Sequence, residues 1–423
     1  MLELTLIVLF ISCFGGYYYN GKFSNYLSIY SIVWIITTFF CSLKLYGQIG
    51  YSETVYEIVI IGDLCFTFGY FVISLSGKKH HISAFHKNHI NRVDSNKKIW
   101  KYSLYICTII NLYIGLQVAW LLLGGVNWYT LRYNYYGEGR LYGPIMSMII
   151  TWFVVPITTY VSLPMLLLEY EKKNVDKTIA VLTILNVLLR VLITGGKGVI
   201  VVFVVNLLVY LLTISRKKKV KMKTLATIIS SLLVFYFLNG LRSGEYNFEF
   251  LYSYLGITLP LMDHWIGVID GYSDNTGLWG YGQIFFYGFL NIPISIIDKI
   301  DSSFALSFNN LGASMDYMVR EGVTIFEGHG PTTNVYLSNL TYFYLDGRIW
   351  GVIIGSFLFG AICRTVEKMI RMDSNYSFAL FILFSTCVFD SFIKWDLYTS
   401  SYVLSFLYLR LLYKTKRIKH VMA

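Results

Sequence analysis

Apolar windows of membrane-spanning length recur along almost the whole chain, and this recurrence limits the fold more than any other feature. Windows of about 17–25 residues match the length that a helix needs to cross roughly 30 Å of hydrocarbon. A backbone exposed to lipid must satisfy its own hydrogen bonds, so each span is expected to be a helix. The composition agrees, with 56% hydrophobic and only 14% charged residues.

We therefore predict an all-α polytopic membrane protein with about eleven (10–12) transmembrane helices. The predicted spans lie near residues 2–19, 26–46, 55–76, 101–124, 144–168, 178–194, 198–214, 224–241, 349–364, 376–393 and 397–413. The N-terminus lacks the basic stretch of a cleavable signal peptide, so the first segment is expected to be a retained span.

One long segment interrupts the series of spans and divides the chain into three parts. Residues 1–241 are expected to form a transmembrane bundle of about eight spans. Residues 242–348 form a mildly acidic loop rich in Gly, Tyr and Trp, and residues 349–423 return to spans and a basic tail. Within the loop, 251–268 and 279–297 are apolar but broken by Pro and Gly, as expected for short interfacial or re-entrant helices.

The lysines and arginines predict the orientation in the membrane. If 77–101 is cytoplasmic, alternation of the spans puts 24 of the 35 Lys and Arg residues in cytoplasmic segments. The loop 242–348 is then extracytoplasmic, as are 125–143 and 195–197. The net charge of +11 follows from this bias, so it indicates contact with anionic membrane lipids and no nucleic-acid partner.

The sequence has no motif for a metal or a nucleotide. The six cysteines lie apart in apolar spans and form no Cys-x-x-Cys pair. Neither G-x-x-x-x-G-K-[ST] nor G-x-G-x-x-G occurs, and the outer loops contain no Asp-x-Asp. We predict no metal site and no cofactor.

Cations on the predicted outer side run against the positive-inside bias and are therefore candidates for function. Arg132 and Arg140 lie in 125–143, Lys197 lies between glycines at the start of a span, and Arg242 opens the long loop. Glycine, an ammonium group and a helix N-terminus together suit a phosphate or pyrophosphate. Aromatic residues cluster beside Arg132 and Arg140; both sugar recognition and a membrane-interface belt remain open for them.

Near the end of the long loop, His329 sits in a Gly/Pro frame, Gly328-His329-Gly330-Pro331. A histidine there can act as a general base or phosphate partner, and a simple turn is the alternative. Asp346-Gly347-Arg348 precedes the next span, and a local salt bridge with a helix cap is the alternative to a functional role.

These stretches resemble a known family. The Thr194-Gly195-Gly196-Lys197 turn, Arg242, His329-Gly330-Pro331-Thr332-Thr333-Asn334 and Tyr344-Leu345-Asp346-Gly347-Arg348 are similar in layout to the Wzy-type oligosaccharide repeat-unit polymerases of O-antigen and capsule synthesis. The order of spans and loop resembles the family over most of the chain, whereas the sequence motifs resemble it only in these short stretches.

The resemblance implies a GT-C-like, metal-independent glycosyltransferase at the outer face of a bacterial cytoplasmic membrane. Undecaprenyl-pyrophosphate-linked oligosaccharides would be donor and acceptor, beside a chain-length regulator and a flippase. On this expectation His329 and Arg242 are catalytic. The expected pyrophosphate-binding residues are Lys197, Arg242, Arg132, Arg140 and Arg320, and the substrate-positioning residues are Asn334, Asp346 and Tyr336.

Three other functions remain open from the sequence. An O-antigen ligase has the same layout and donor but a different acceptor. A lipid-linked oligosaccharide flippase would be expected to carry charges at mid-membrane in corresponding spans. An acyltransferase would use a His or Ser nucleophile system near the cytoplasmic side.

Overall fold

The computed structural model covers a chain of 423 residues, and it describes part of them. The described residues are 1–75, 95–126, 130–131, 142–194, 198–213, 252, 254–271, 280–298, 302–327, 332–333, 337–370 and 375–413, with the backbone alone at 302–305, 320 and 332–333.

Helices dominate the described residues, and seven of them are long and apolar enough to cross a membrane. These are α1 (Leu2–Asn20), α3 (Thr54–Leu75), α4 (Lys97–Leu123), the run Pro144–Glu171, α8 (Lys177–Thr194), α15 (Asn339–Ile370) and the run Asn375–Phe392. Three shorter apolar helices also fall on predicted spans: α2 (Tyr26–Ser42), α9 (Gly198–Thr213) and α17 (Ser400–Leu412).

The chain is therefore an all-α, multi-pass membrane protein, as the hydropathy indicates. The expected span at 224–241 lies outside the described residues, so the count of about eleven stays a prediction. The side of the membrane that each loop faces also stays a prediction.

The long loop adds three shorter helices, α12 (Thr258–Gly271), α13 (Tyr287–Ile297) and α14 (Ser302–Arg320). The first two fall within or beside the predicted short helices, whereas α14 was not expected. A small hairpin of β1 (Val323–Thr324) and β2 (Thr332–Thr333) follows, paired antiparallel. Short 3-10 turns complete the described elements at η1 (Leu45–Gly47), η4 (Asp390–Phe392) and η5 (Asp396–Tyr398).

The chain forms two compact units, which are each described by themselves. Unit 1 comprises residues 1–85, 246–368 and 387–400, and unit 2 comprises residues 86–245, 369–386 and 401–423. Unit 1 thus contains α1 to α3, the helices of the long loop, most of α15 and the turns η4 and η5. The three parts predicted from the sequence have other boundaries than these two units, and that division stays a prediction.

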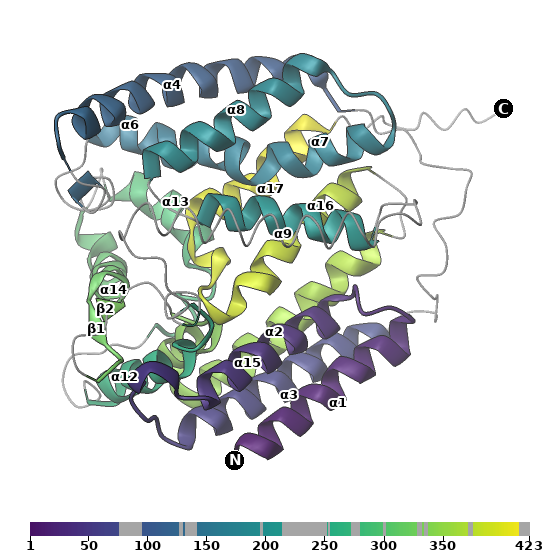
Figure 1. The fold of residues 1–423 in the computed structure, drawn as a ribbon, viewed down its shortest axis with the longest axis vertical. Coiled ribbons are helices and arrows are strands. Elements are labelled where there is room, and N and C mark those ends of the chain that lie inside the picture. Colours follow the sequence, from purple (N-terminus) through teal and green to yellow (C-terminus); the bar gives the residue numbers. More distant parts are fainter. Residues whose placement is uncertain are drawn as a thin grey trace. The chain divides into compact units, whose positions relative to one another are not determined.

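In unit 2 the helix ends that were predicted to be cytoplasmic gather at one end. Lys97 at the start of α4 lies 3.2 Å from Glu169 of α7 (Ser162–Glu171), and Lys101 lies 3.7 Å from Asp176. The backbone N–H of Asn96 donates to Leu412 O near the end of α17, at 2.7 Å. Figure 1 shows α4 and α8 running side by side in this unit.

The run Pro144–Glu171 is a helix with a π-helical middle. It passes from α6 (Pro144–Ile149) through π-helical turns at Ile150–Val154 and Pro156–Val161 into α7. Pro156 has no N–H to donate and its ring crowds the preceding turn, which accounts for the wider helical turns around it.

Unit 1 has a group of polar contacts at each of its two ends. At one end, residues 43–53, 390–399 and the described residues between 252 and 327 meet; we call this the loop end. There the N–H of Ile49 donates to Ile325 O at 2.7 Å, and Trp395 Nε1 donates to Phe285 O at 3.1 Å. At the opposite end, residues 19–26, 70–75 and 364–368 meet. Figure 1 shows α1, α2 and α3 lying alongside one another in this unit.

Helix α15 is in fact two helices that fold back on each other. Arg348 has φ 54° and ψ −139°, which breaks the helix after Gly347. Phe343 and Phe359 lie sixteen positions apart, about 24 Å in a straight helix, yet both ring centroids lie 4.9 Å from that of Trp395. Residues 339–346 form the short arm and residues 349–370 the long arm.

The long arm also packs against α3 without intervening side chains. A Cβ on Gly69 would collide with the backbone of Phe357, and a Cβ on Gly360 would collide with the backbone of Phe66. Small residues at such a crossing let two membrane helices approach closely and gain van der Waals contact.

Candidate functional site

The loop end of unit 1 is the candidate site because the turn between the two arms of α15 brings charged side chains together there. Asp346 ends the short arm and is 7% exposed. Its carboxylate accepts hydrogen bonds from the backbone N–H groups of Ile284, at 3.1 Å, and Phe285, at 3.0 Å. Asp346 therefore fixes the turn that leads into α13.

Gly280 completes that contact. Its N–H donates to Leu345 O at 3.1 Å, and a Cβ at this position would collide with the Asp346 carboxylate. The chain at 280–285 thus wraps closely around the end of the short arm, and a larger residue at position 280 would displace the Asp346 and Ile284 side chains.

Arg348 joins the turn to α12. Its Nε lies 3.2 Å from Asp270 Oδ1, one of its terminal nitrogens donates to Ile269 O at 2.7 Å, and its guanidinium lies over the Tyr344 ring at 5.7 Å. Tyr344 Oη in turn donates to the same Asp270 carboxylate, with O–O distances of 2.9 and 3.1 Å. A cation at the last turn of α12 also suits the negative end of the helix dipole.

A second charged cluster lies between η4 and η5. Lys394 Nζ is 3.2 Å from Asp390 Oδ2 and 2.7 Å from Asp396 Oδ1. Both carboxylates are buried, whereas the lysine side chain is 35% exposed. The lysine therefore covers two buried acids at the surface of the loop end.

Aromatic rings connect these elements. Tyr287 stacks between Phe308 and Tyr398, with ring centroids 4.4 Å apart on each side, and Tyr342 lies 5.2 Å from Tyr398. Both faces of Tyr287 are covered, so this stack holds α13, α14 and η5 together.

His264 on α12 is the one histidine in the described ranges, and it is exposed. Partial burial lowers its pKa below the ordinary value of 6.5, and the nearby carboxylates of Asp263 and Glu321 only partly oppose this. Asp263 itself is held by the backbone N–H of Ser52 at 3.2 Å and by the Ser52 hydroxyl. Histidine 264 is therefore neutral near pH 7 and able to accept a proton.

Most of the site residues predicted from the sequence lie outside the described residues. These are His329, Arg242, Lys197, Arg132, Arg140, Asn334 and Tyr336. Arg320 is the last residue of α14, and its side chain also lies outside the described part. Asp346 is placed at the loop end, with the backbone contacts given above. The functional roles of all these residues stay predictions.

The structure also shows charged residues that the sequence reasoning missed. Asp63 lies near the middle of α3 and is 1% exposed, where its carboxylate accepts from Ser12 Oγ at 2.5 Å and Ser31 Oγ at 3.2 Å. A carboxylate in the middle of an apolar window was the available signal. Thr67, Tyr70 and Ser74 follow it at helical spacing on one face of α3.

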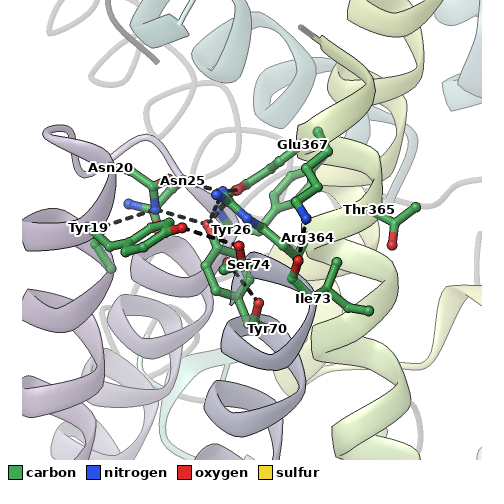
Figure 2. Close-up of polar contacts among 12 residues, drawn as sticks. Tyr19, Asn20, Asn25, Tyr26, Tyr70, Ile73, Ser74, Arg364, Thr365 and Glu367 are labelled. Carbon is green, nitrogen blue, oxygen red and sulfur yellow. Dashed lines mark hydrogen bonds and ion pairs between the residues drawn. The ribbon is translucent and has the colours of Figure 1, made fainter. Parts of the chain in front are cut away.

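A second missed group lies at the opposite end of unit 1, as Figure 2 shows. Arg364 and Glu367, each with side chains 1% exposed, pair at 2.9 Å within α15. The Arg364 guanidinium also donates to Asn20 Oδ1 at 3.0 Å and Tyr70 Oη at 3.2 Å, and the N–H of Tyr26 donates to Glu367. This network joins α1, α2, α3 and α15. The spacing Arg364-x-x-Glu367 was its signal in the sequence.

In the described part of the chain, no group of three or more His, Cys, Asp or Glu residues is placed to hold a metal ion. Comparison with known proteins gives no further constraint, since no family model, no curated protein and no solved structure matches the chain.

Proposed function

We propose that this protein is a membrane glycosyltransferase that polymerises lipid-linked oligosaccharide repeat units. Its donor and acceptor are undecaprenyl-pyrophosphate-linked oligosaccharides, and the reaction takes place at the outer face of a bacterial cytoplasmic membrane. The product is a surface polysaccharide such as an O-antigen or a capsule.

One observation carries this proposal. The helices of the long loop, the turn of α15 and the segment 390–399 meet at a single end of unit 1, where they gather aromatic rings, buried carboxylates and two partly exposed cations, Arg348 and Lys394, each paired with a carboxylate. Sugars present hydroxyl groups and flat C–H faces, which carboxylates and aromatic rings recognise. A pyrophosphate needs cations. Both kinds of side chain are concentrated at this one end.

The chemistry needs few protein groups. The acceptor hydroxyl loses a proton to a base, and its oxygen attacks C1 of the donor sugar. The C1–O bond to the pyrophosphate breaks, and its electron pair leaves with the pyrophosphate. Cations stabilise the charge that develops on this leaving group, as in other electrostatically assisted transfers. In this proposal His329 takes the proton, while Arg242 and Lys197 hold the pyrophosphate.

The test is the glycan profile of a deletion strain, complemented with the wild-type gene. We expect a single repeat unit on the carrier or on the surface acceptor in the deletion strain, and a polymer ladder after complementation. Arg242→Ala and His329→Ala variants should fail to restore the ladder while reaching the membrane at wild-type levels. A ladder of normal length in the deletion strain would refute the proposal. Full-length polymer left on its lipid carrier would indicate a ligase instead.

A transporter of the same lipid-linked oligosaccharide is the second candidate, and the interior of unit 1 favours it. Asp63 lies near the middle of α3, and α15 is broken so that its short arm ends beside α3. Ionisable residues at mid-membrane and discontinuous helices are typical of transporters. Repeat units retained on the cytoplasmic leaflet of the deletion strain would support this function over polymerisation.

A further inference from the structure

Helix α4 in unit 2 has an exposed apolar stripe that ends in a lysine. The stripe follows the helical spacing along one face, and each of its members is 50% exposed or more: Tyr102, Ile106, Ile109, Tyr113 and Leu116. Lys98 is exposed and lies one turn before Tyr102 on the same face, in the first turn of the helix. The lysine therefore stands at the end of a surface that faces lipid.

Helix α8 repeats this arrangement. Val181, Ile184 and Leu188 follow one another at helical spacing and are 63%, 51% and 62% exposed. Lys177, the first residue of α8, is exposed and lies one turn before Val181 on that face. The eleven positions from Lys177 to Leu188 correspond to about 16 Å of helix. That length is close to one leaflet, which is half of the roughly 30 Å of hydrocarbon in a bilayer.

The two helices run side by side in the same direction (Figure 1). Near their starts, Lys101 of α4 lies 3.7 Å from Asp176, the residue before α8. Further along, a Cβ on Gly115 of α4 would meet the side chain of Leu189 of α8 at 3.4 Å. Both exposed lysines therefore lie at the same end of the pair.

The two stripes also face the same side of the pair. Successive residues of a helix are rotated by about 100° about its axis. Gly115 faces α8, and Leu116 of the stripe is the residue after it; Leu189 faces α4, and Leu188 of the stripe is the residue before it. In parallel helices these opposite rotations point to one side. The stripes thus form one apolar surface with both lysines at one end.

The described part of the chain supplies no anion for these two lysines. The ammonium groups of Lys98 and Lys177 form no ion pair or hydrogen bond there, because the nearby carboxylates of Glu169 and Asp176 are paired with other lysines. A first-turn position also disfavours a cation, since it lies at the positive end of the helix dipole. An anion from outside the described residues would therefore stabilise both.

We propose that Lys98 and Lys177 bind the phosphate of an acidic glycerophospholipid whose acyl chains lie along the stripes of α4 and α8. A phosphodiester carries the charge that the two ammonium groups lack, and acyl chains match the stripes in polarity and length. Tyr102 and Tyr170, which are 68% and 63% exposed near the same end, are typical of the membrane interface, where such a headgroup lies.

Lipid binding to the full-length protein in detergent tests the headgroup contact. Native mass spectrometry counts bound phosphatidylglycerol, with phosphatidylethanolamine of the same acyl chains as the neutral comparison. We expect tighter binding of phosphatidylglycerol, weakened about fivefold by Lys98→Gln or Lys177→Gln and about 25-fold by both. Replacing both lysines by arginine should preserve binding.

Lys172→Gln is the matched control, because that lysine lies at the same end but pairs with Glu169 at 3.4 Å. Its affinity for phosphatidylglycerol should equal that of the wild type. Equal affinity of the wild type for the two lipids, or undiminished affinity for phosphatidylglycerol in the double glutamine variant, would overturn the proposal.

Lysine substitutions also alter how spans insert into a membrane, so a second measurement uses the wild type alone. Phosphatidylglycerol with a photoreactive group in one acyl chain should label residues 102–116 and 181–188. Excess phosphatidylglycerol should suppress this labelling, whereas phosphatidylethanolamine should not. Equal suppression by phosphatidylethanolamine, or stronger suppression by undecaprenyl phosphate than by phosphatidylglycerol, would contradict the assigned lipid. Neither measurement depends on glycosyl transfer.

Discussion

Gly351 lies directly against the backbone carbonyl of Phe343, a residue eight positions earlier in the same helix. This contact exists only because α15 reverses at Gly347 and Arg348, and it shows how tightly the two arms pack. The ring of Phe343 also covers Gly355, one turn further along the long arm.

Substitutions at these glycines should therefore destabilise the turn of α15. Overpacking a core typically costs about 1–3 kcal/mol. We expect Gly351→Val to lower the free energy of unfolding by about 3 kcal/mol or more, because the obstructing atom belongs to the backbone and cannot rotate away. Thermal unfolding in detergent measures the effect. Gly267→Ala on α12 is the matched control, since nothing lies within 4 Å of its added Cβ. Equal stability of the two variants would contradict the folded-back arrangement.

The Arg364–Glu367 pair predicts an asymmetric response to mutation. Glu367→Gln leaves a buried guanidinium without its counter-charge and should cost about 3–5 kcal/mol of unfolding free energy. Replacing both residues by apolar ones, as in Arg364→Met with Glu367→Leu, should recover much of that loss. Glu57→Gln, at an exposed position of α3, is the control and should change little. A double variant less stable than Glu367→Gln would argue against this account.

Asp346 should matter for stability as well as for activity. Asp346→Ala leaves the N–H groups of Ile284 and Phe285 without their acceptor, at about 1–3 kcal/mol for each buried donor. Asp346→Asn keeps one carbonyl acceptor and should lose less. Comparing unfolding and polymer length in the two variants separates the roles: a stable Asn variant that makes no polymer would indicate that the charge itself is needed.

His264 predicts a dependence of stability on acid. Its folded-state pKa lies below the unfolded value near 6.5, so the folded state disfavours the proton. The stabilisation from this group is fully present above pH 6.5 and is lost as pH falls through the folded-state pKa. The melting temperature of His264→Gln should therefore fall less than that of the wild type as the pH is lowered from neutral. Parallel pH profiles for the two proteins would contradict the shift.

The sequence predicted the membrane helices well because hydropathy alone decides them. The ends of α1, α3, α8 and α9 fall within one or two residues of the predicted spans. By contrast, the short arm of α15 was read as loop, because a segment of eight residues cannot cross a membrane and its place depends on Gly351 and Gly355. The helix α14 was missed for a related reason, since its apolar face is completed by Tyr287 from another helix.

For the candidate site, the sequence pointed to the long loop 242–348 but not to the contacts that its described residues make. Asp346 was named from its motif, yet its partners at 284 and 285 lie about sixty residues away and leave no local signal. A local salt bridge was one of the two alternatives for Arg348, whereas its guanidinium reaches Asp270 on α12. Asp63 was overlooked because isolated acids do not interrupt an apolar window, although its burial against Ser12 and Ser31 is the feature that marks it.

The backbone contact at Gly69 and Gly360 limits how unit 1 can move. Where two helices touch without side chains between them, no side chain can change its rotamer to accommodate sliding. Even a small shift would drive backbone atoms into each other. Any motion within this unit must therefore leave α3 and the long arm as a fixed pair. The short arm belongs to the same rigid body, because the backbone carbonyl of Phe343 lies against Gly351 in the same way.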